Sequence, residues 1–334
     1  MPGLLCRLGG AAPLIHKIRK RGCERLLKYL FSRLWQSIIV LIGVTLVTFI
    51  LLNIVPGDPV LVMLNKRADA ETVERVRHEM GLDRPLYVQY FDFVANAVQG
   101  DLGTSYFQKR PVTEMLNQGF SMTFQLGALS LVFSVVFGLI VGTLAALFRG
   151  KFLDHFLMFI AMLGISMPIF WLGVLLQILF GLKLGWLPIS GVKEAGWLTM
   201  PVICLGVSYG ASASRLIRTN MLDALGQDYV RTARAKGLSE TIVVGKHVLK
   251  NAAIPIVTLI GMQLRSLISG AMVIEMVFSL HGLGKIAFSA VTSRDIPIIQ
   301  GCVLYTAAVY VIINLIVDLL YGVLDPRIRI VKGA

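Results

Sequence analysis

The chain has 334 residues, of which 56% are hydrophobic and only 15% are charged. Soluble domains carry about 25% charged residues, so this composition excludes an ordinary water-soluble enzyme and indicates a protein solvated largely by lipid. The formal net charge of +13 does not indicate nucleic-acid binding, because the basic residues are distributed unevenly around long apolar segments.

Six apolar stretches reach the length of about 20 residues that a membrane-spanning helix needs. They are 34–55, 120–148, 153–181, 198–216, 252–278 and 298–323. The sequence therefore predicts an all-α membrane protein with six transmembrane helices. Most of these stretches exceed the minimum length, so we expect tilting or extension beyond the lipid.

Lysine and arginine residues predict the orientation, because they are enriched in cytoplasmic loops. One side of the predicted membrane holds 20 of them, including eight in 1–33 and seven in 215–250, and the other side holds 11. Both termini are therefore expected in the cytoplasm, with 1–33 as a basic N-terminal segment and 325–334 as a tail. Residues 1–27 fit either a cytoplasmic extension or a misassigned start codon.

Residues 56–119 lie between the first and second predicted spans and form an extracytoplasmic insert. The run AETVERVRHEM at 70–80 predicts an amphipathic helix that stops at Gly81. The run LYVQYFDFVANAV at 86–98 predicts a second helix, closed by the glycine-containing turn 100–103. The insert can serve as a packing cap on the bundle, as a docking surface, or as both.

Two spans carry unusual residues. Met167-Pro168 interrupts the third span near its middle and predicts a kink or a re-entrant segment. The fourth span is rich in glycine, alanine and serine, which allow helix backbones to approach closely, so we expect it inside the bundle.

Two ionisable residues fall within the fifth span, where charge is costly and often functional. Arg265 lies about 14 residues into the span, about 21 Å along a helix, and must face water, a carboxylate or another subunit. Glu275 either lines a translocation path or anchors the loop 279–284 by hydrogen bonds. Met167 and Pro168 complete the set of residues expected near a path.

The stretch 228–258, DYVRTARAKGLSETIVVGKHVLKNAAIPIVT, is a basic helix–glycine–helix pattern between two spans. It resembles the loop by which permease subunits of ABC importers dock onto their ATPases. The family pattern is Glu-Ala-Ala, three residues and Gly. Here the triplet is Arg231-Thr232-Ala233, followed by Gly237. The missing acidic residue and the run RTARAKG are similar to the peptide/nickel branch of the family.

Further stretches resemble the same branch. They are GLDRPL with GDLGTS in the insert, GAMVIEMVFSLHGLGK at 270–285 and the closing DPRIR. His281 stands where the family usually has proline. The resemblance covers roughly 28–330 and implies a type I ABC importer (MetI-like) permease fold in a bacterial inner membrane. It implies a first helix at 34–55, a core at 120–324 and a coupling loop at 217–251.

The resemblance also implies the partners: a second homologous permease subunit, two ATP-binding subunits and an extracytoplasmic solute-binding protein. ATP and Mg²⁺ would be bound by the ATPase subunits, and no cofactor, metal or catalytic residue is expected in this chain. Dipeptides, oligopeptides, glutathione, opines and nickel complexes all remain open as substrates. The residues expected to dock the ATPase are Tyr229, Arg231, Thr232, Ala233, Arg234, Ala235, Lys236 and Gly237.

Within this docking segment, Gly237 is expected to permit the turn after the helix. Ala233 and Ala235 are expected to keep the helix slim for close contact, while the basic side chains pair with acidic residues of the ATPase.

Two other classes of protein fit an apolar multi-span chain. A self-sufficient secondary transporter or channel often has paired broken helices from inverted repeats, but only one broken span is predicted here. A membrane enzyme needs a catalytic constellation, and the four cysteines and five histidines share no ligand spacing. The run HGLGK lacks the first glycine and the Ser or Thr of a Walker A motif.

Overall fold

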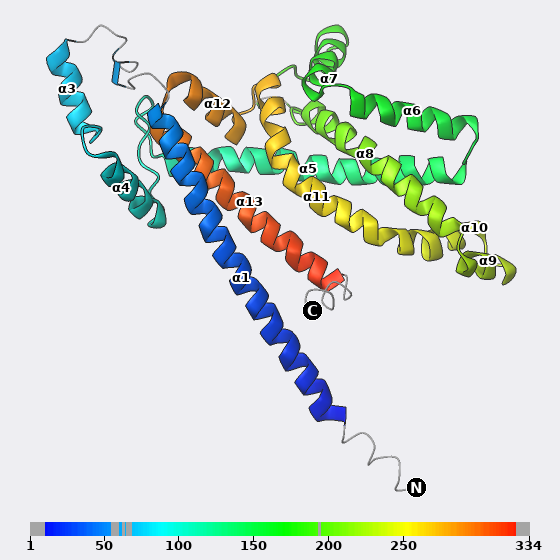
Figure 1. Cartoon of the computed structure of the whole chain (residues 1–334). Coiled ribbons are helices and arrows are strands. Elements are labelled where there is room, and N and C mark those ends of the chain that lie inside the picture. The colour runs from blue at the N-terminus through cyan, green and yellow to red at the C-terminus, as the bar shows by residue number, and fades with distance from the viewer. Residues whose placement is uncertain (1–10, 55–59, 62–63, 65–68, 193–194, 325–334) are drawn as a thin grey trace.

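The structure, a computed structural model, describes residues 11–54, 60–61, 64, 69–192 and 195–324, apart from the side chains of 11–30, 252–255, 257, 265, 267–270 and 319–324. The described residues form an all-helical protein (Figure 1). The long helices are α1 Ala11–Ile54, α5 Val112–Leu147, α8 Thr199–Leu225, α11 Leu249–Val277 and α13 Ile296–Leu324. The shorter ones are α3 Ala70–Glu79, α4 Leu86–Val98, α6 Phe152–Ser166, α7 Ile169–Leu176, α9 Asp228–Ala235, α10 Glu240–Ile242 and α12 Leu283–Ser293, with π-helical segments η1 Gln177–Lys183 and η2 Val243–Val248.

Among the described residues, four helices are long and apolar enough to cross a membrane, and one bent helix pair can supply a fifth span. The four are Phe31–Ile54, Val112–Leu147, Thr199–Leu225 and Ile296–Asp318. The bent pair is Phe152–Ser166 with Ile169–Lys183. These spans confirm an all-α membrane protein, and α11 follows the predicted fifth span closely.

Helix boundaries differ from the predicted ones at three places. Helix α5 begins at Val112, eight residues before the predicted second span, so the insert expected at 56–119 ends earlier. Helix α1 begins at Ala11, so residues 11–33 continue the first helix instead of forming a separate segment. Helix α8 runs to Leu225, so the coupling loop expected from residue 217 begins with two further helical turns. The predicted tail at 325–334 and residues 1–10 lie outside the described residues.

The third predicted span is broken at Met167 and Pro168. Met167 has extended backbone angles, and Pro168 precedes the first residue of α7, so the chain bends by 106° between the two helices. Proline lacks the N–H group that would continue α6. The carbonyl of Ile169, at the bend, accepts a hydrogen bond from the Cys204 thiol of α8 at 3.1 Å.

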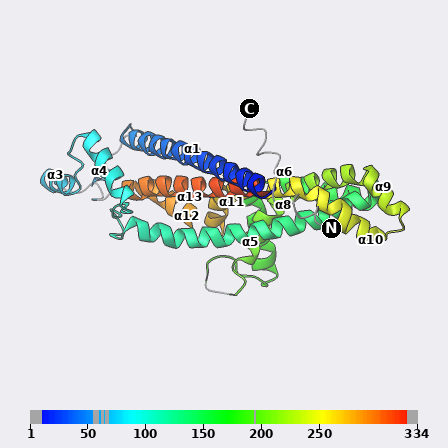
Figure 2. The ribbon, with the colours of Figure 1, turned by 90° about the horizontal axis from the view of Figure 1, so that it is seen from below.

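Helices α5 and α8 pack closely through small residues, as the composition of α8 predicts. A Cβ added at Gly142 would lie 2.6 Å from the Ser214 carbonyl oxygen, and one at Gly138 would lie 2.6 Å from Ala213. In the most apolar window of α8, 56% of residues are buried, against 11% in α1. Helix α8 therefore lies inside the bundle, while α1 lies at its edge beside α13 (Figure 2).

The insert has the two helices that the sequence predicts. The Asp69 carboxylate caps α3 by accepting the Thr72 N–H at 3.1 Å. Gly81, two residues after the end of α3, has φ +65°. Helix α4 ends before Gly100, whose φ is +85°. A side-chain cap thus begins α3, Pro85 precedes α4, and a glycine with positive φ follows each helix.

A buried carboxylate holds the end of the insert against the bundle. Asp295, at 1% exposure between α12 and α13, accepts the Ser105 hydroxyl at 2.6 Å. It also accepts the backbone N–H groups of Tyr106 at 3.2 Å and Phe107 at 3.4 Å. The insert is therefore a fixed part of the molecule next to α12 and α13.

Candidate functional site

Helix α9 lies at one end of the molecule, beyond the end of α8 (Figure 1). Gly237 follows it with φ +76°, and the Gly237 N–H donates to the Arg234 carbonyl at 2.9 Å. This left-handed conformation favours glycine, because a side chain with a Cβ is strained there. The helix–glycine–helix pattern of the sequence is thus present, with α10 and η2 as the second helical part.

Helix α9 has one exposed face and one buried face. The exposed residues among those expected to dock a partner are Tyr229, Arg231, Thr232, Arg234, Ala235, Lys236 and Gly237. Ala233 differs from the expectation: it is only 5% exposed and faces inward with Val230, which is fully buried. Ala233 therefore packs α9 onto the protein and does not belong to the exposed face.

The basic residues of this face are partly paired within the chain. Arg234 donates two hydrogen bonds to the Glu240 carboxylate, at 2.7 and 3.2 Å. These bonds lower the pKa of Glu240 and raise that of Arg234. Arg231 lies 3.6 Å from Asp228 on the same helix. Because all four side chains are exposed, these ion pairs are weak and a partner can compete for them.

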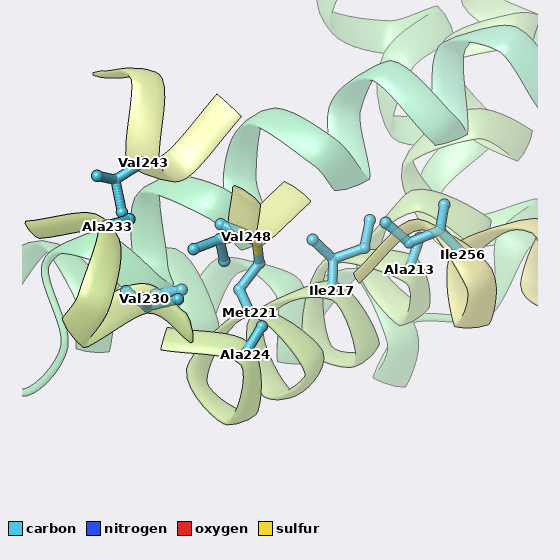
Figure 3. Packing of buried hydrophobic residues seen from close by; sticks show 10 residues of the cluster. Ala213, Ile217, Met221, Ala224, Val230, Ala233, Val243, Val248 and Ile256 are labelled. Carbon is cyan, nitrogen blue, oxygen red and sulfur yellow. The ribbon is translucent and has the colours of Figure 1, made fainter. Parts of the chain in front are cut away.

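A hydrophobic cluster connects α9 to the spanning helices (Figure 3). Val230 and Ala233 of α9 pack with Val243 and Val248 of η2. The cluster also includes Ala146, Ala213, Ile217, Met221, Ala224 and Ile256, which belong to α5, α8 and α11. A force on α9 therefore reaches three long helices through close-packed side chains, which are poorly compressible.

A buried ion pair fixes α6 to α8 near this cluster. The Asp154 carboxylate, 1% exposed, accepts two hydrogen bonds from the Arg218 guanidinium, both at 2.7 Å, and the Gly150 N–H at 2.9 Å. The sequence did not predict this pair. The available signal was a carboxylate within the apolar run FLDHFLMF, since ionisable residues in spans usually have a specific partner.

Glu275 is fully buried near the end of α11. Its carboxylate accepts the Thr123 hydroxyl at 2.5 Å, the Gly284 N–H at 2.8 Å and the Lys285 N–H at 3.3 Å. Thr123 in turn accepts the Leu283 N–H at 2.9 Å. These contacts are those of an anchor that joins α5, α11 and the start of α12, the second of the two roles considered for Glu275.

The structure describes the side chains of two of the other residues expected near a translocation path. Met167 is half-buried and Pro168 is exposed at the bend between α6 and α7. The Arg265 side chain lies outside the described residues. No group of three metal-ligating side chains occurs in the part of the chain that the structure describes.

The chain matches two descriptions of protein families. Residues 134–330 match the binding-protein-dependent transport system inner membrane component, and residues 26–127 match the N-terminal part of such membrane components. Together the two matches include most of the chain.

Curated relatives agree with this match. The chain is 42% identical over 304 residues to the glutathione transport system permease protein GsiC of Escherichia coli strain K12 and of Shigella dysenteriae serotype 1. In each case the alignment covers 91% of this chain and 99% of the relative.

Solved structures show the same fold. A chain of the MetNI methionine ABC transporter in an inward-facing conformation superposes with a TM-score of 0.55 at 20% identity, covering 63% of this chain and 96% of that one. A second crystal form of that transporter gives a TM-score of 0.52.

The chain thus belongs to the family of binding-protein-dependent transport system inner membrane components: it is a multi-pass inner-membrane permease subunit of an ABC importer, in which a separate subunit is the ATPase.

Proposed function

We propose that this chain forms half of the translocation path of an importer for peptides or related small solutes, and that α9 docks it onto an ATPase subunit. The assembly would contain a second homologous permease subunit, two ATP-binding subunits that hold ATP and Mg²⁺, and an external solute-binding protein. All six predicted spans would cross the membrane, with both termini in the cytoplasm.

The packing of α9 is the observation that carries this proposal. Its exposed face presents basic and small side chains, while Val230 and Ala233 on its buried face join the cluster shared with α5, α8 and α11. A partner that moves α9 therefore moves the spanning helices. In this mechanism, closure of the ATPases displaces α9 and shifts the bundle between its outward-open and inward-open states.

Similarity to curated relatives supports the proposed substrate class. The relatives with 42% identity are described as glutathione transport permeases, and alignment over 99% of their length leaves no large part of them unmatched. Glutathione is a short peptide, so we propose small peptides of this kind as the cargo. Arg265, Glu275, Met167 and Pro168 remain the proposed path residues, with Glu275 acting by anchoring the loop beside the path.

Charge reversal on α9 tests the docking role. Arg231→Glu replaces an exposed cation, so we expect normal membrane insertion of the chain but loss of most ATPase subunit on co-purification. Arg149→Glu is the matched control, because Arg149 is an exposed cation in the turn between α5 and α6 and lies outside α9. Equal recovery of the ATPase with both variants would contradict the proposed docking surface.

A further inference from the structure

Helix α4 of the insert contacts α1 within the apolar span of α1. The Tyr90 hydroxyl lies 3.1 Å from the Thr45 hydroxyl and donates toward the Ile42 carbonyl at 3.4 Å. The rings of Tyr90 and Phe49 meet edge to face at 5.4 Å. The span of α1 ends at Ile54, nine residues beyond Thr45, which is about 14 Å along a helix.

The side chains of α4 divide into three faces at helical spacing. Tyr90 and Ala97 face the protein, where Ala97 packs against the cluster of α5, α12 and α13. A polar strip of Gln89, Asp92 and Asn96 lies about half a turn around the helix from Tyr87, Phe91 and Val98. Gln89 is half-buried and donates to the Leu82 and Arg84 carbonyls, whereas Asp92 and Asn96 are exposed.

The third face of α4 is apolar and exposed. Tyr87 and Phe91 are each 67% exposed and Val98 is 84% exposed, while no residue of α4 is fully buried. Exposed apolar side chains of α1, including Val47 and Leu51, lie in the same stretch of that helix as Thr45. Exposing such area to water is unfavourable, and a lipid surface removes it from water without a protein partner.

We propose that α4 is an interfacial helix, which lies in the membrane leaflet on the insert's side and contacts lipid chains through Tyr87, Phe91 and Val98. The exposed Asp92 and Asn96 of the polar strip then face water, and the face with Tyr90 and Ala97 contacts the protein. This is the distribution expected of an amphipathic helix at a bilayer surface. Tyrosine is enriched at membrane–water interfaces, and phenylalanine is typical of the apolar face of an interfacial helix.

Helix α3 provides an internal contrast. Its sequence AETVERVRHE is mostly charged, and Val73 is its buried residue. The described part of the insert therefore combines a water-exposed helix with a lipid-facing one. Lipid contact would hold the insert at a fixed height and orientation, so that α3 faces outward to meet an external partner.

Spin labelling tests the proposal in the complete importer. Single cysteines replace Tyr87, Phe91, Val98, Asn96 or Glu74 in a chain whose native cysteines are substituted, and each labelled complex is reconstituted in phospholipid vesicles. Molecular oxygen concentrates in lipid and a nickel chelate concentrates in water. We expect the ratio of oxygen to nickel accessibility to exceed one at Tyr87→Cys, Phe91→Cys and Val98→Cys.

The matched controls are Asn96→Cys on the polar strip of α4 and Glu74→Cys on α3, where the ratio should fall below one. Greater nickel than oxygen access at Phe91→Cys and Val98→Cys would show that this face meets water. Exclusion of both reagents there would show that a protein subunit covers it. Either result would overturn the interfacial placement, and neither depends on the role of α9.

Discussion

Glu275 shows how a single buried carboxylate can organise a loop. It accepts one hydroxyl and two backbone N–H groups, and the same hydroxyl, that of Thr123, accepts the N–H of Leu283. The bonds from Thr123 and Gly284 are buried, so these two donors would otherwise lack an acceptor. The acid thus joins the start of α12, nine residues further along the chain, to the distant helix α5.

Replacement of Glu275 by alanine should strongly destabilise the purified chain. Each buried donor left without an acceptor costs about 1–3 kcal/mol, so the loss of three acceptor contacts should lower the apparent Tm by several degrees. Glu275→Gln keeps one acceptor oxygen and should lie between alanine and the natural residue. An unchanged Tm in Glu275→Ala, measured by thermal unfolding in detergent, would contradict the anchoring role.

A special role for a residue was predictable from the sequence where the neighbouring residues alone revealed it. The sequence marks Glu275 as an ionisable residue within an apolar stretch, and one of the two roles considered for it agrees with the observed hydrogen bonds. Its partner Thr123 and the Asp154–Arg218 pair could not be read from the sequence. These contacts depend on which faces of distant helices meet, and periodicity alone does not contain that information.

At the scale of elements, the contact of α5 with α8 depends on the absence of side chains. Gly138 and Gly142 face Ala213 and Ser214 of α8 so closely that a Cβ has no room. Close backbone approach of this kind favours helix association in a membrane, where the hydrophobic effect provides little driving force.

Gly142→Ala should therefore destabilise the chain, because its Cβ would lie 2.6 Å from the Ser214 carbonyl oxygen and 2.9 Å from Ile217. Overpacking typically costs about 1–3 kcal/mol. Gly43→Ala on α1 is the control: nothing lies within 4 Å of its added Cβ, and alanine favours helix by about 1 kcal/mol. A comparison of apparent Tm values in detergent checks this, and equal decreases for both variants would contradict it.

Most elements were predictable because local chemistry sets their limits. Asp69, Gly81 and Gly100 delimit the insert helices, and Pro168 separates α6 from α7. The inward orientation of Ala233 was not predictable, because it depends on how α9 is rotated against η2. The separate helix α12 was also missed, since its sequence lies between two apolar spans and lacks a strong start signal.

At the scale of the whole molecule, the family assignment excludes the self-sufficient transporter and the membrane enzyme. The chain is a permease subunit whose ATPase is a separate polypeptide. The insert, the bundle and α9 are joined by buried contacts: Asp295 at one end and the cluster around Val230 at the other. These contacts link α9 to the spanning helices and the insert to the segment between α12 and α13.

Cross-linking from α9 in the assembled importer tests this account most directly. Ala235→Cys and Ala233→Cys each carry a photoreactive maleimide label in a chain whose native cysteines are substituted. Position 235 is exposed and position 233 is buried on the same helix. We predict efficient cross-linking to the ATPase subunit from position 235 and little from position 233. Failure of position 235 to cross-link, or its labelling by an impermeant maleimide from outside intact cells, would contradict the account.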